Sequence, residues 1–323
     1  MKIAFLGNFR VPYTSENHYM KTLRDLGHEV YPLQEGTDKI NQIMARATKM
    51  DMLFWVHTHG WDTVGIDIGI KKLKELGIPT VGYHLDLWLG LERQKDLATD
   101  PYWDIEHFFT VDKLMEEYLN QNENLPQGHY LPAGVFKDEC YIAPTTGFKH
   151  DVVFVGSGIY HHEWTYRHKL IEWLEETYGD RFAHYGSGGI KASVRGAELN
   201  QLYADSKIVI GDTLCKGFEY PYYLSDRIFE TTGRGGFIIH PYVKHMEDLF
   251  NLGGIDNEYF NMDEMEVATY DFDNFDYLKY AIDYFLENDE EREVIRRRGH
   301  AKTLVNHTYH NRLNYLLETI NGK

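Results

Sequence analysis

Short apolar runs alternate with amphipathic stretches along the first 131 residues. The runs predict buried strands, and apolar residues recurring every three or four positions predict helices between them. The predicted strands are Lys2–Gly7, His28–Pro32, Met52–His57, Pro79–His84, Phe108–Val111 and His129–Leu131, and the predicted helices cover about 15–26, 37–49, 64–76 and 113–120. Strands separated by helices in this way indicate a doubly wound, mostly parallel sheet.

A second series of the same kind follows a segment without clear periodicity, Pro132–His150. Its predicted strands are Asp151–Val155, Arg181–Tyr185, Ile208–Ile210 and Phe237–His240, and its predicted helices cover about 164–177, 196–204, 225–233, 242–250 and 273–287, before a helical stretch at 290–321. The two series predict two Rossmann-like domains, 1–136 and 151–304, joined by a linker at 137–150. We expect the C-terminal helix, about 305–323, to pack back on the first domain.

Parallel α/β sheets bind ligands at the carboxyl ends of their strands. We therefore expect the two domains to face each other across a cleft that holds the ligand. Polar and glycine-rich residues that directly follow a predicted strand are the candidate site residues.

The net charge of the chain bears on whether it binds nucleic acid. The chain has 33 Lys and Arg against 50 Asp and Glu, a net charge of −17. Thirteen of these acids and one lysine lie in residues 256–291, which leaves −5 for the remainder. This balance disfavours nucleic acid without excluding it.

Neither a membrane span nor export is predicted. No apolar run approaches the roughly 20 residues that span a bilayer. The N-terminal apolar run is a first strand and too short for a signal peptide. Two cysteines, Cys140 and Cys215, give no disulfide framework and no cysteine zinc site. We expect a cytoplasmic protein.

Residues 223–240 predict a helix followed at once by a buried strand. Ser225 is suited to the N-cap, and Gly235, with the glycines on either side of it, is suited to the helix end. Free N–H groups at the start of such a helix favour an anionic ligand.

The charged residues of this helix are Asp226, Arg227 and Glu230. Asp226 and Glu230 stand one turn apart on one face, with the cation beside them. A cation, free N–H groups and carboxylates suit a ligand that carries both phosphate and sugar hydroxyls, as in the donor site of a nucleotide-sugar glycosyltransferase. The alternative interpretation is a solvated charged face.

Two glycine loops leave strands of the same domain. Gly156 and Ser157 follow one strand, and residues 185–189 follow the next, with Arg195 shortly beyond. Small residues let a diphosphate approach the backbone. Each loop alone fits an ordinary turn, but three such strand ends in one domain predict a nucleotide pocket.

His84 and Asp86 end a strand of the first domain. Strand alternation places both on one side. The histidine could orient or polarise a sugar, and the aspartate could accept a proton or bind hydroxyls. A structural His–Asp hydrogen bond is the alternative.

Other polar strand ends in the first domain are candidates for the acceptor side. The loop after the first strand lacks the glycine patterns of dehydrogenases and P-loop NTPases, and its polar residues fit either an acceptor surface or a solvated loop. His57 and His59 lack a third ligand at suitable spacing, so no metal site is predicted. The acceptor-side candidates are Asn8, Glu16, His18, His57 and His59.

With these residues in place, the chain resembles the bilobal GT-B glycosyltransferases of the group-1 type, including spore-maturation-like and phage-borne members. The resemblance is clearest over about 151–245, weaker over 1–135, and includes the tail at His307–Leu313. It implies that the second domain binds the nucleotide sugar.

The resemblance also implies residue roles. Glu230 matches the residue that contacts the ribose, and Arg227 and Ser225 match positions that hold the diphosphate or sugar. Many retaining members carry a second Glu eight residues earlier, where this chain has Tyr222, so either Asp226 or Glu219 substitutes for it or the donor sugar is held differently.

Together these features predict a metal-independent, retaining transferase that moves a hexosyl or pentosyl group from a nucleoside diphosphate sugar, most readily a UDP-sugar. The acceptor is open: a small molecule, polysaccharide, protein or modified DNA. The predicted catalytic residues are His84, Asp86 and Arg227, and the predicted donor-binding residues are Gly156, Ser157, Arg195, Ser225, Asp226, Arg227, Glu230 and Gly235. The alternatives are a phage-type transferase acting on hydroxymethylated bases of DNA, a nucleotide-sugar epimerase and a catalytically silent sugar-binding protein.

Overall fold

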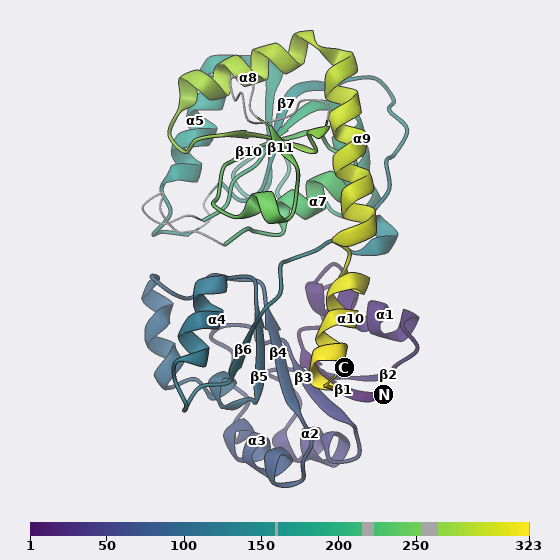
Figure 1. The fold of residues 1–323 in the computed structure, drawn as a ribbon, viewed down its shortest axis with the longest axis vertical. Coiled ribbons are helices and arrows are strands. Elements are labelled where there is room, and N and C mark those ends of the chain that lie inside the picture. Colours follow the sequence, from purple (N-terminus) through teal and green to yellow (C-terminus); the bar gives the residue numbers. More distant parts are fainter. Residues whose placement is uncertain (159–160, 215–222, 254–263, 323) are drawn as a thin grey trace. The chain divides into compact units, whose positions relative to one another are not determined.

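The computed structural model describes residues 1–158, 161–214, 223–253 and 264–322, which form two compact units (Figure 1). The first domain comprises Met1–Pro132 and Tyr309–Lys323, and the second comprises Ala133–Thr308. The chain therefore leaves the first domain once and returns to it with its last helix.

The first domain contains a six-stranded sheet in the order β2-β1-β3-β4-β5-β6. Every neighbouring pair is parallel. The strands are β1 (Lys2–Gly7), β2 (Glu29–Gln34), β3 (Met52–Trp55), β4 (Thr80–His84), β5 (His107–Thr110) and β6 (Gln127–Tyr130). The helices are α1 (Ser15–Asp25), α2 (Ile40–Ala47), α3 (Ile66–Glu75), α4 (Lys113–Asn120) and α10 (Tyr309–Ile320), with 3-10 helices at Glu92–Ala98 and Pro101–Asp104.

Strand alternation gives this sheet two different buried faces. Leu53 belongs to the cluster that includes apolar residues of α2, α3 and α4. Its neighbour Phe54 lies on the opposite face, where its ring packs 6.2 Å from Tyr19 of α1. Tyr19 in turn stacks on Tyr83 and meets Tyr309 of α10 edge-on, with centroids 5.3 and 4.8 Å apart. The C-terminal helix thus completes a face of the first domain.

The second domain repeats the architecture, with a parallel sheet in the order β11-β12-β10-β9-β7-β8. The strands are β7 (His150–Val155), β8 (Phe182–Tyr185), β9 (Ser206–Ile210), β10 (Ile238–Pro241), β11 (Leu252–Gly253) and β12 (Val267–Tyr270). The helices are α5 (Tyr166–Tyr178), α6 (Gly196–Ala204), α7 (Arg227–Gly233), α8 (Phe275–Glu287) and α9 (Asp289–Asn306), with 3-10 helices at Lys137–Glu139, Gly179–Arg181 and Met246–Asp248.

Helices surround this sheet as well. Val153 and Val209 form a core cluster with Leu199 and Tyr203 of α6. Elsewhere in the domain, α5 packs on α8 through Trp173, which stacks on a phenylalanine of α8 with centroids 4.9 Å apart. Two helix-covered parallel sheets confirm the predicted pair of Rossmann-like domains.

Two predicted segments differ in the structure, and two strands, β11 and β12, were not predicted. Residues 242–250 contain only the short 3-10 helix, because His245 takes a left-handed backbone with φ of 74° and interrupts the helical run. The stretch 290–321 divides into α9 and α10 at Thr308, which bridges to Val135. The strand β12 was not predicted from the sequence, because its residues lie in the acidic stretch.

The predicted linker, 137–150, packs against the second domain. The Asn200 amide donates hydrogen bonds to the carbonyls of Glu139 and Tyr141, both at 2.8 Å. The buried Asp205 carboxylate accepts the backbone N–H of Thr146 at 2.7 Å. These polar contacts hold the segment in place although it lacks helix or strand periodicity.

A buried polar clamp joins three segments of the first domain. His57, directly after β3, donates from Nδ1 to Glu35 Oε1 at 2.5 Å and from Nε2 to Asp100 Oδ2 at 3.1 Å. Trp55 Nε1 and the Thr58 N–H donate to the same Glu35 carboxylate, both within 2.8 Å. Burial opposes the imidazolium charge, but the hydrogen bonds and the attraction of both carboxylates raise the pKa of His57 to about 9.

The packing of α10 generates a stability prediction. Leu313 is fully buried, so Leu313→Ala should lower the free energy of unfolding of the first domain by about 2–5 kcal/mol. Tyr315 on the same helix is half exposed, so Tyr315→Ala serves as the matched control and should change it by less than about 0.5 kcal/mol. Urea unfolding measures both. Equal losses in the two variants would contradict the assigned face of α10.

The clamp generates a pH prediction. Because the pKa of His57 is raised, its stabilisation is complete below the ordinary pKa of about 6.5 and is lost as the pH rises through about 9. The difference in unfolding free energy between the native chain and His57→Gln should shrink by about 3 kcal/mol over this range. Urea titrations at several pH values measure the difference, and one that stays constant would refute a charged His57.

Candidate functional site

Arg227, the first residue of α7, lies across the carboxyl end of β7. Its Nε donates to the Val155 carbonyl at 3.0 Å, and its Nη1 donates to the Asp212 carbonyl at 2.7 Å. The guanidinium carbon is 5.2 Å from the centroid of the Phe154 ring. A Cβ on Gly156 would lie 2.5 Å from Arg227 Nη2, so only glycine accommodates the guanidinium in this position.

A second guanidinium, from Arg167 of α5, enters the same region. Its Nε donates to Asp212 Oδ2 at 2.7 Å, and both side chains are almost completely buried. The Trp164 indole N–H lies 3.2 and 3.3 Å from the two oxygens of that carboxylate. Arg167 Nη1 also donates to the Ser157 carbonyl at 3.3 Å. Asp212, which follows β9, therefore connects α5 with the end of the sheet.

Among the described residues of this site, the positive charge of the guanidiniums exceeds the negative charge of the buried carboxylate. Arg167 bonds the buried carboxylate of Asp212, whereas Arg227 bonds only the backbone carbonyl of the same residue. Burial and then repulsion by Arg167 lower the pKa of Arg227, while Asp212 and Asp226 act in the opposite direction. The Asp226 side chain is exposed, so water screens its contribution. The site therefore favours an added anion, and guanidinium groups suit phosphate oxygens.

The two glycine loops meet beside this cation pair. Gly186 has φ of 130°, and a Cβ there would overlap the Gly156 carbonyl. The Gly158 N–H donates to the Ser187 carbonyl at 2.8 Å, and His184 Nε2 donates to the Gly156 carbonyl at 2.8 Å. The structure thus brings together the ends of β7, β8 and β9, where the sequence analysis places a nucleotide pocket.

Ser225 does not cap α7, so that prediction is wrong. Its hydroxyl donates to the Asp212 carbonyl at 3.3 Å, and its N–H donates to Thr213 Oγ1 at 3.1 Å. Asp226 is the N-cap residue, already in a helical backbone and without a side-chain cap. Ser225 therefore links the start of α7 to the two residues Asp212 and Thr213 after β9, and the seven-residue helix offers the ligand no N-terminal site of its own.

Glu230 lies one turn after Asp226, and Arg234 holds its carboxylate. Its Oε2 accepts a hydrogen bond from Arg234 Nε at 2.8 Å, and its side chain remains 19% exposed. Arg234 also pairs with Glu139 and donates to Asn200 Oδ1 at 2.7 Å. This buried network fixes the carboxylate of Glu230 with part of its surface accessible.

Two other predicted donor-binding residues, Arg195 and Gly235, take no part in the contacts described above. Arg195 precedes α6, is exposed, and has no side-chain hydrogen bond or ion pair within the part of the chain that the structure describes. Gly235 is buried in the turn after α7, where φ is 76° and its N–H donates to the Thr232 carbonyl at 3.0 Å. A Cβ there would lie 2.6 Å from Ile142, so this glycine serves the turn and not a ligand. Tyr222 and Glu219 lie outside the described residues.

In the first domain, His84 and Asp86 lie together at the end of β4. His84 Nε2 is 3.3 Å from Asp86 Oδ2, yet it forms no hydrogen bond with any residue that the structure describes. The histidine is buried, whereas the aspartate side chain is half exposed and lies 3.8 Å from Arg93 Nη1. Their proximity agrees with the expectation from strand alternation, and the unsatisfied imidazole nitrogen is available for another partner.

The remaining acceptor-side candidates take mostly structural positions. His57 belongs to the buried clamp. His59 is 3.7 Å from Asp96 Oδ2 and its ring meets Trp88 edge-on. Glu16 Oε1 accepts the Asn8 N–H at 3.3 Å, and burial raises the pKa of Glu16. The ring of His18 on α1 lies 6.4 Å from that of Tyr309.

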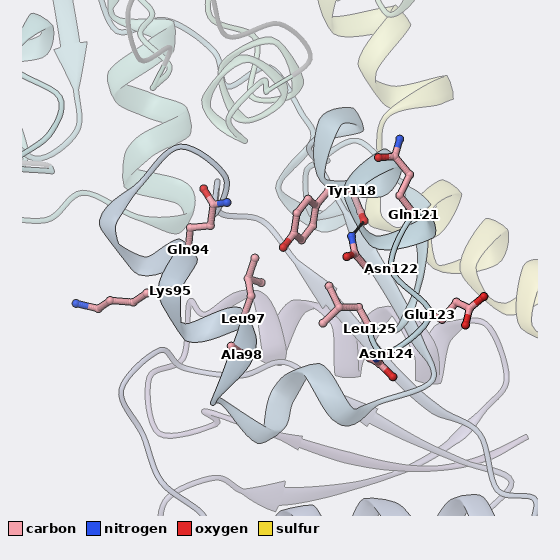
Figure 2. A pocket seen from close by; sticks show the side chains of 10 residues that line it. All are labelled: Gln94, Lys95, Leu97, Ala98, Tyr118, Gln121, Asn122, Glu123, Asn124 and Leu125. Atoms are coloured by element: carbon pink, nitrogen blue, oxygen red, sulfur yellow. Dashed lines mark hydrogen bonds between the residues drawn. The ribbon is translucent and has the colours of Figure 1, made fainter.

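A pocket of about 770 Å³ lies elsewhere in the first domain, between the 3-10 helix at Glu92–Ala98 and α4 (Figure 2). Its lining combines four carboxamides with one tyrosine and small apolar groups, from Gln94, Lys95, Leu97, Ala98, Tyr118, Gln121, Asn122, Glu123, Asn124 and Leu125. None of the predicted acceptor-side residues lines it.

The sequence analysis overlooked several polar residues of the second domain. Arg167 and Trp164 gave no signal beyond following a glycine loop. His240 at the end of β10 is fully buried, with Nδ1 2.7 Å from the Pro241 carbonyl and no partner for Nε2. Burial lowers the pKa of His240 to about 4, so its imidazole is neutral.

The described residues contain neither a metal-binding cluster nor a membrane-spanning helix. No group of three or more His, Cys, Asp or Glu side chains there is arranged to hold a metal ion. No described helix is both long and apolar enough to cross a membrane.

Comparisons with known proteins agree with the fold. A family model described as "Glycosyl transferase-like" matches residues 167–318. HepE of Anabaena, solved with UDP and glucose, aligns over 100% of both chains at 12% identity with a TM-score of 0.67. A glycosyltransferase of Rickettsia africae aligns over 98% of this chain and 97% of its own at 11% identity, with a TM-score of 0.62.

An alpha-glucosyltransferase, solved with UDP and a 13-mer DNA containing an HMU base, aligns over 99% of both chains at 10% identity with a TM-score of 0.68. A search of curated protein sequences finds no match. Residues 167–318 thus match a glycosyl transferase-like family model, and the two Rossmann-like domains have the GT-B fold of these solved structures.

Proposed function

We propose that this protein transfers a sugar from a nucleoside diphosphate sugar to an acceptor, with the donor bound at the carboxyl edge of the second domain. The surplus positive charge of Arg167 and Arg227 around one buried carboxylate is the observation that carries the proposal. The glycine loops at Gly156 and Gly186 lie beside these cations, and both glycines are partly exposed. UDP and UDP-glucose are the ligands of structures with the same fold, so a UDP-hexose is the proposed donor.

In this proposal Arg227 stabilises the negative charge that builds up on the departing diphosphate. Preorganised cations in a site poor in water lower the barrier most, because they need no reorientation during the reaction. Hydrogen bonds to two backbone carbonyls already fix the Arg227 guanidinium. We propose that these guanidiniums make a metal ion unnecessary.

Glu230 is the proposed partner of the ribose. A carboxylate accepts two hydroxyl hydrogen bonds, and a vicinal diol supplies two donors. Arg234 holds one oxygen of Glu230 and so sets the orientation of the group. We extend the proposal to retention of the anomeric configuration, which the resemblance to retaining members implies.

The proposed contribution of the first domain is His84 with Asp86. The unsatisfied Nε2 of His84 can accept a hydrogen bond or a proton from a hydroxyl. The half-exposed Asp86 carboxylate beside it would support the protonated ring. Asn8, Glu16, His18 and His59 have weaker support, since none shows an unsatisfied group.

DNA is a second candidate acceptor, favoured by the fold shared with an alpha-glucosyltransferase solved on DNA. The net charge of the first domain disfavours DNA as the acceptor, because this domain has 15 Lys and Arg against 20 Asp and Glu, a net charge of −5. Binding to DNA that falls steeply as salt is added would support this candidate.

The donor site is tested by binding of UDP. Arg227→Gln removes a charge-assisted contact worth about 1.5–3 kcal/mol, so the Kd of UDP should rise roughly 10- to 100-fold. Gly156→Ala should weaken binding as well, because the new methyl group displaces the guanidinium. Arg46→Gln on the first domain is the matched control for charge. Calorimetry in buffer with a chelator measures all four proteins.

Melting temperatures without ligand show whether each variant is folded. Unchanged UDP affinity in a folded Arg227→Gln protein would exclude the proposed site. Binding in the native protein without any sugar transfer would favour the silent binding protein, and turnover of the donor without an acceptor would favour the epimerase.

His84 is tested by turnover. His84→Gln should lower kcat by about 10²- to 10⁴-fold while the Kd of UDP stays unchanged, because the residue lies outside the donor-binding domain. His59→Gln, another histidine of the first domain, is the control and should lose less than about tenfold. Equal activities of the His84→Gln and native proteins would remove His84 from the mechanism.

A further inference from the structure

A second cationic pocket lies in the second domain, with a volume of about 270 Å³. It is formed by the segment before β7, the start of β9 and the first half of α9. The residues that matter for its chemistry are Thr145, Phe148, Lys207, Arg292, Arg296 and Arg297. Four of them are cations, and Glu293 is the one carboxylate of the lining.

The carboxylates around this pocket are shared between cations. Glu293 accepts from Arg296 at 2.7 Å and from Arg297 at 2.6 Å. Lys207 lies 2.9 Å from Asp151, which also accepts from Arg181 at 2.6 Å. Asp289 pairs with Arg292 at 2.7 Å, so three carboxylates meet five cations, and the pocket retains a positive surplus in a chain whose net charge is −17.

An exposed aromatic ring borders the pocket. Phe148 is 54% exposed, which is unusual for so large an apolar side chain. Lys207 Nζ and the Arg292 guanidinium lie 5.9 and 5.8 Å from its ring centroid. Two cations thus lie within 6 Å of the centre of this exposed ring, in a pocket that Thr145 also lines.

This pocket is separate from the proposed donor site. Lys207 is the second residue of β9, whereas Asp212 follows the last residue of that strand. A strand rises about 3.3 Å per residue, so the two sites lie roughly 17 Å apart at opposite edges of the sheet. The pocket cannot be an extension of the diphosphate site.

We propose that this pocket binds a small phosphorylated ligand through its phosphoryl group. A surplus of guanidinium and ammonium groups suits phosphoryl oxygens. The volume is below the range of about 300–1,000 Å³ typical for drug-sized ligands, which favours a compact anion over a polymer. The proposal does not depend on the glycosyl transfer proposed above.

Inorganic phosphate is the probe, and amide NMR of the full-length protein separates the two sites. Phosphate should shift the amides of Thr145, Phe148 and Lys207 with saturation. The variant Lys207→Gln/Arg297→Gln removes the two cations that do not contact buried backbone carbonyls. It should weaken this binding by at least about tenfold. Amide shifts at Gly156 and Gly186 report phosphate at the donor site. They should be the same in this variant as in the native chain.

Arg46→Gln/Lys49→Gln, two exposed cations of the first domain, is the matched control and should bind phosphate as the native chain does. Chloride at equal ionic strength should not reproduce the shifts. The proposal is overturned if phosphate gives no saturable shift at the pocket amides, or if the Lys207→Gln/Arg297→Gln variant binds it equally well. It is also overturned if a 12-mer single strand of DNA binds there far more tightly than phosphate and with steep salt dependence.

Discussion

The buried pair of Arg167 and Asp212 is the interaction on which the candidate donor site depends. An ion pair without water is costly to form, and removing one partner leaves an uncompensated buried charge. Here one carboxylate holds a guanidinium and an indole N–H, while the carbonyl of the same residue holds Arg227. The ends of β7 and β9 and the starts of α5 and α7 are fixed by these contacts.

Close packing around the Arg227 guanidinium also explains why residues 156 and 186 are glycines. A guanidinium that lies flat against the end of β7 leaves no space for a side chain on Gly156, and the turn after β8 approaches so closely that Gly186 must be glycine as well. Glycine at these positions is a requirement of packing before any ligand arrives.

The two domains share one architecture, a parallel sheet covered by helices, but the polar residues at their strand ends differ in charge balance. In the first domain, carboxylates on both sides of His57 neutralise it and convert a strand end into a structural clamp. In the second domain, the two guanidiniums outnumber the one buried carboxylate among the described residues of the site. Balance of charge therefore separates a stabilising cluster from a candidate binding site, although both lie where a parallel sheet places its ligands.

The sequence by itself determined the architecture, because strand and helix periodicities are local and each domain repeats them. It also indicated Gly156, Arg227 and Glu230, since a strand end followed by glycine or by a charged helix is visible in the chain. Only the tertiary structure decided that Ser225 bonds the segment after β9, that His57 is clamped and that Arg167 joins Arg227. Those contacts link residues 13 to 45 positions apart, and no local pattern specifies which distant carboxylate or carbonyl will meet a given side chain.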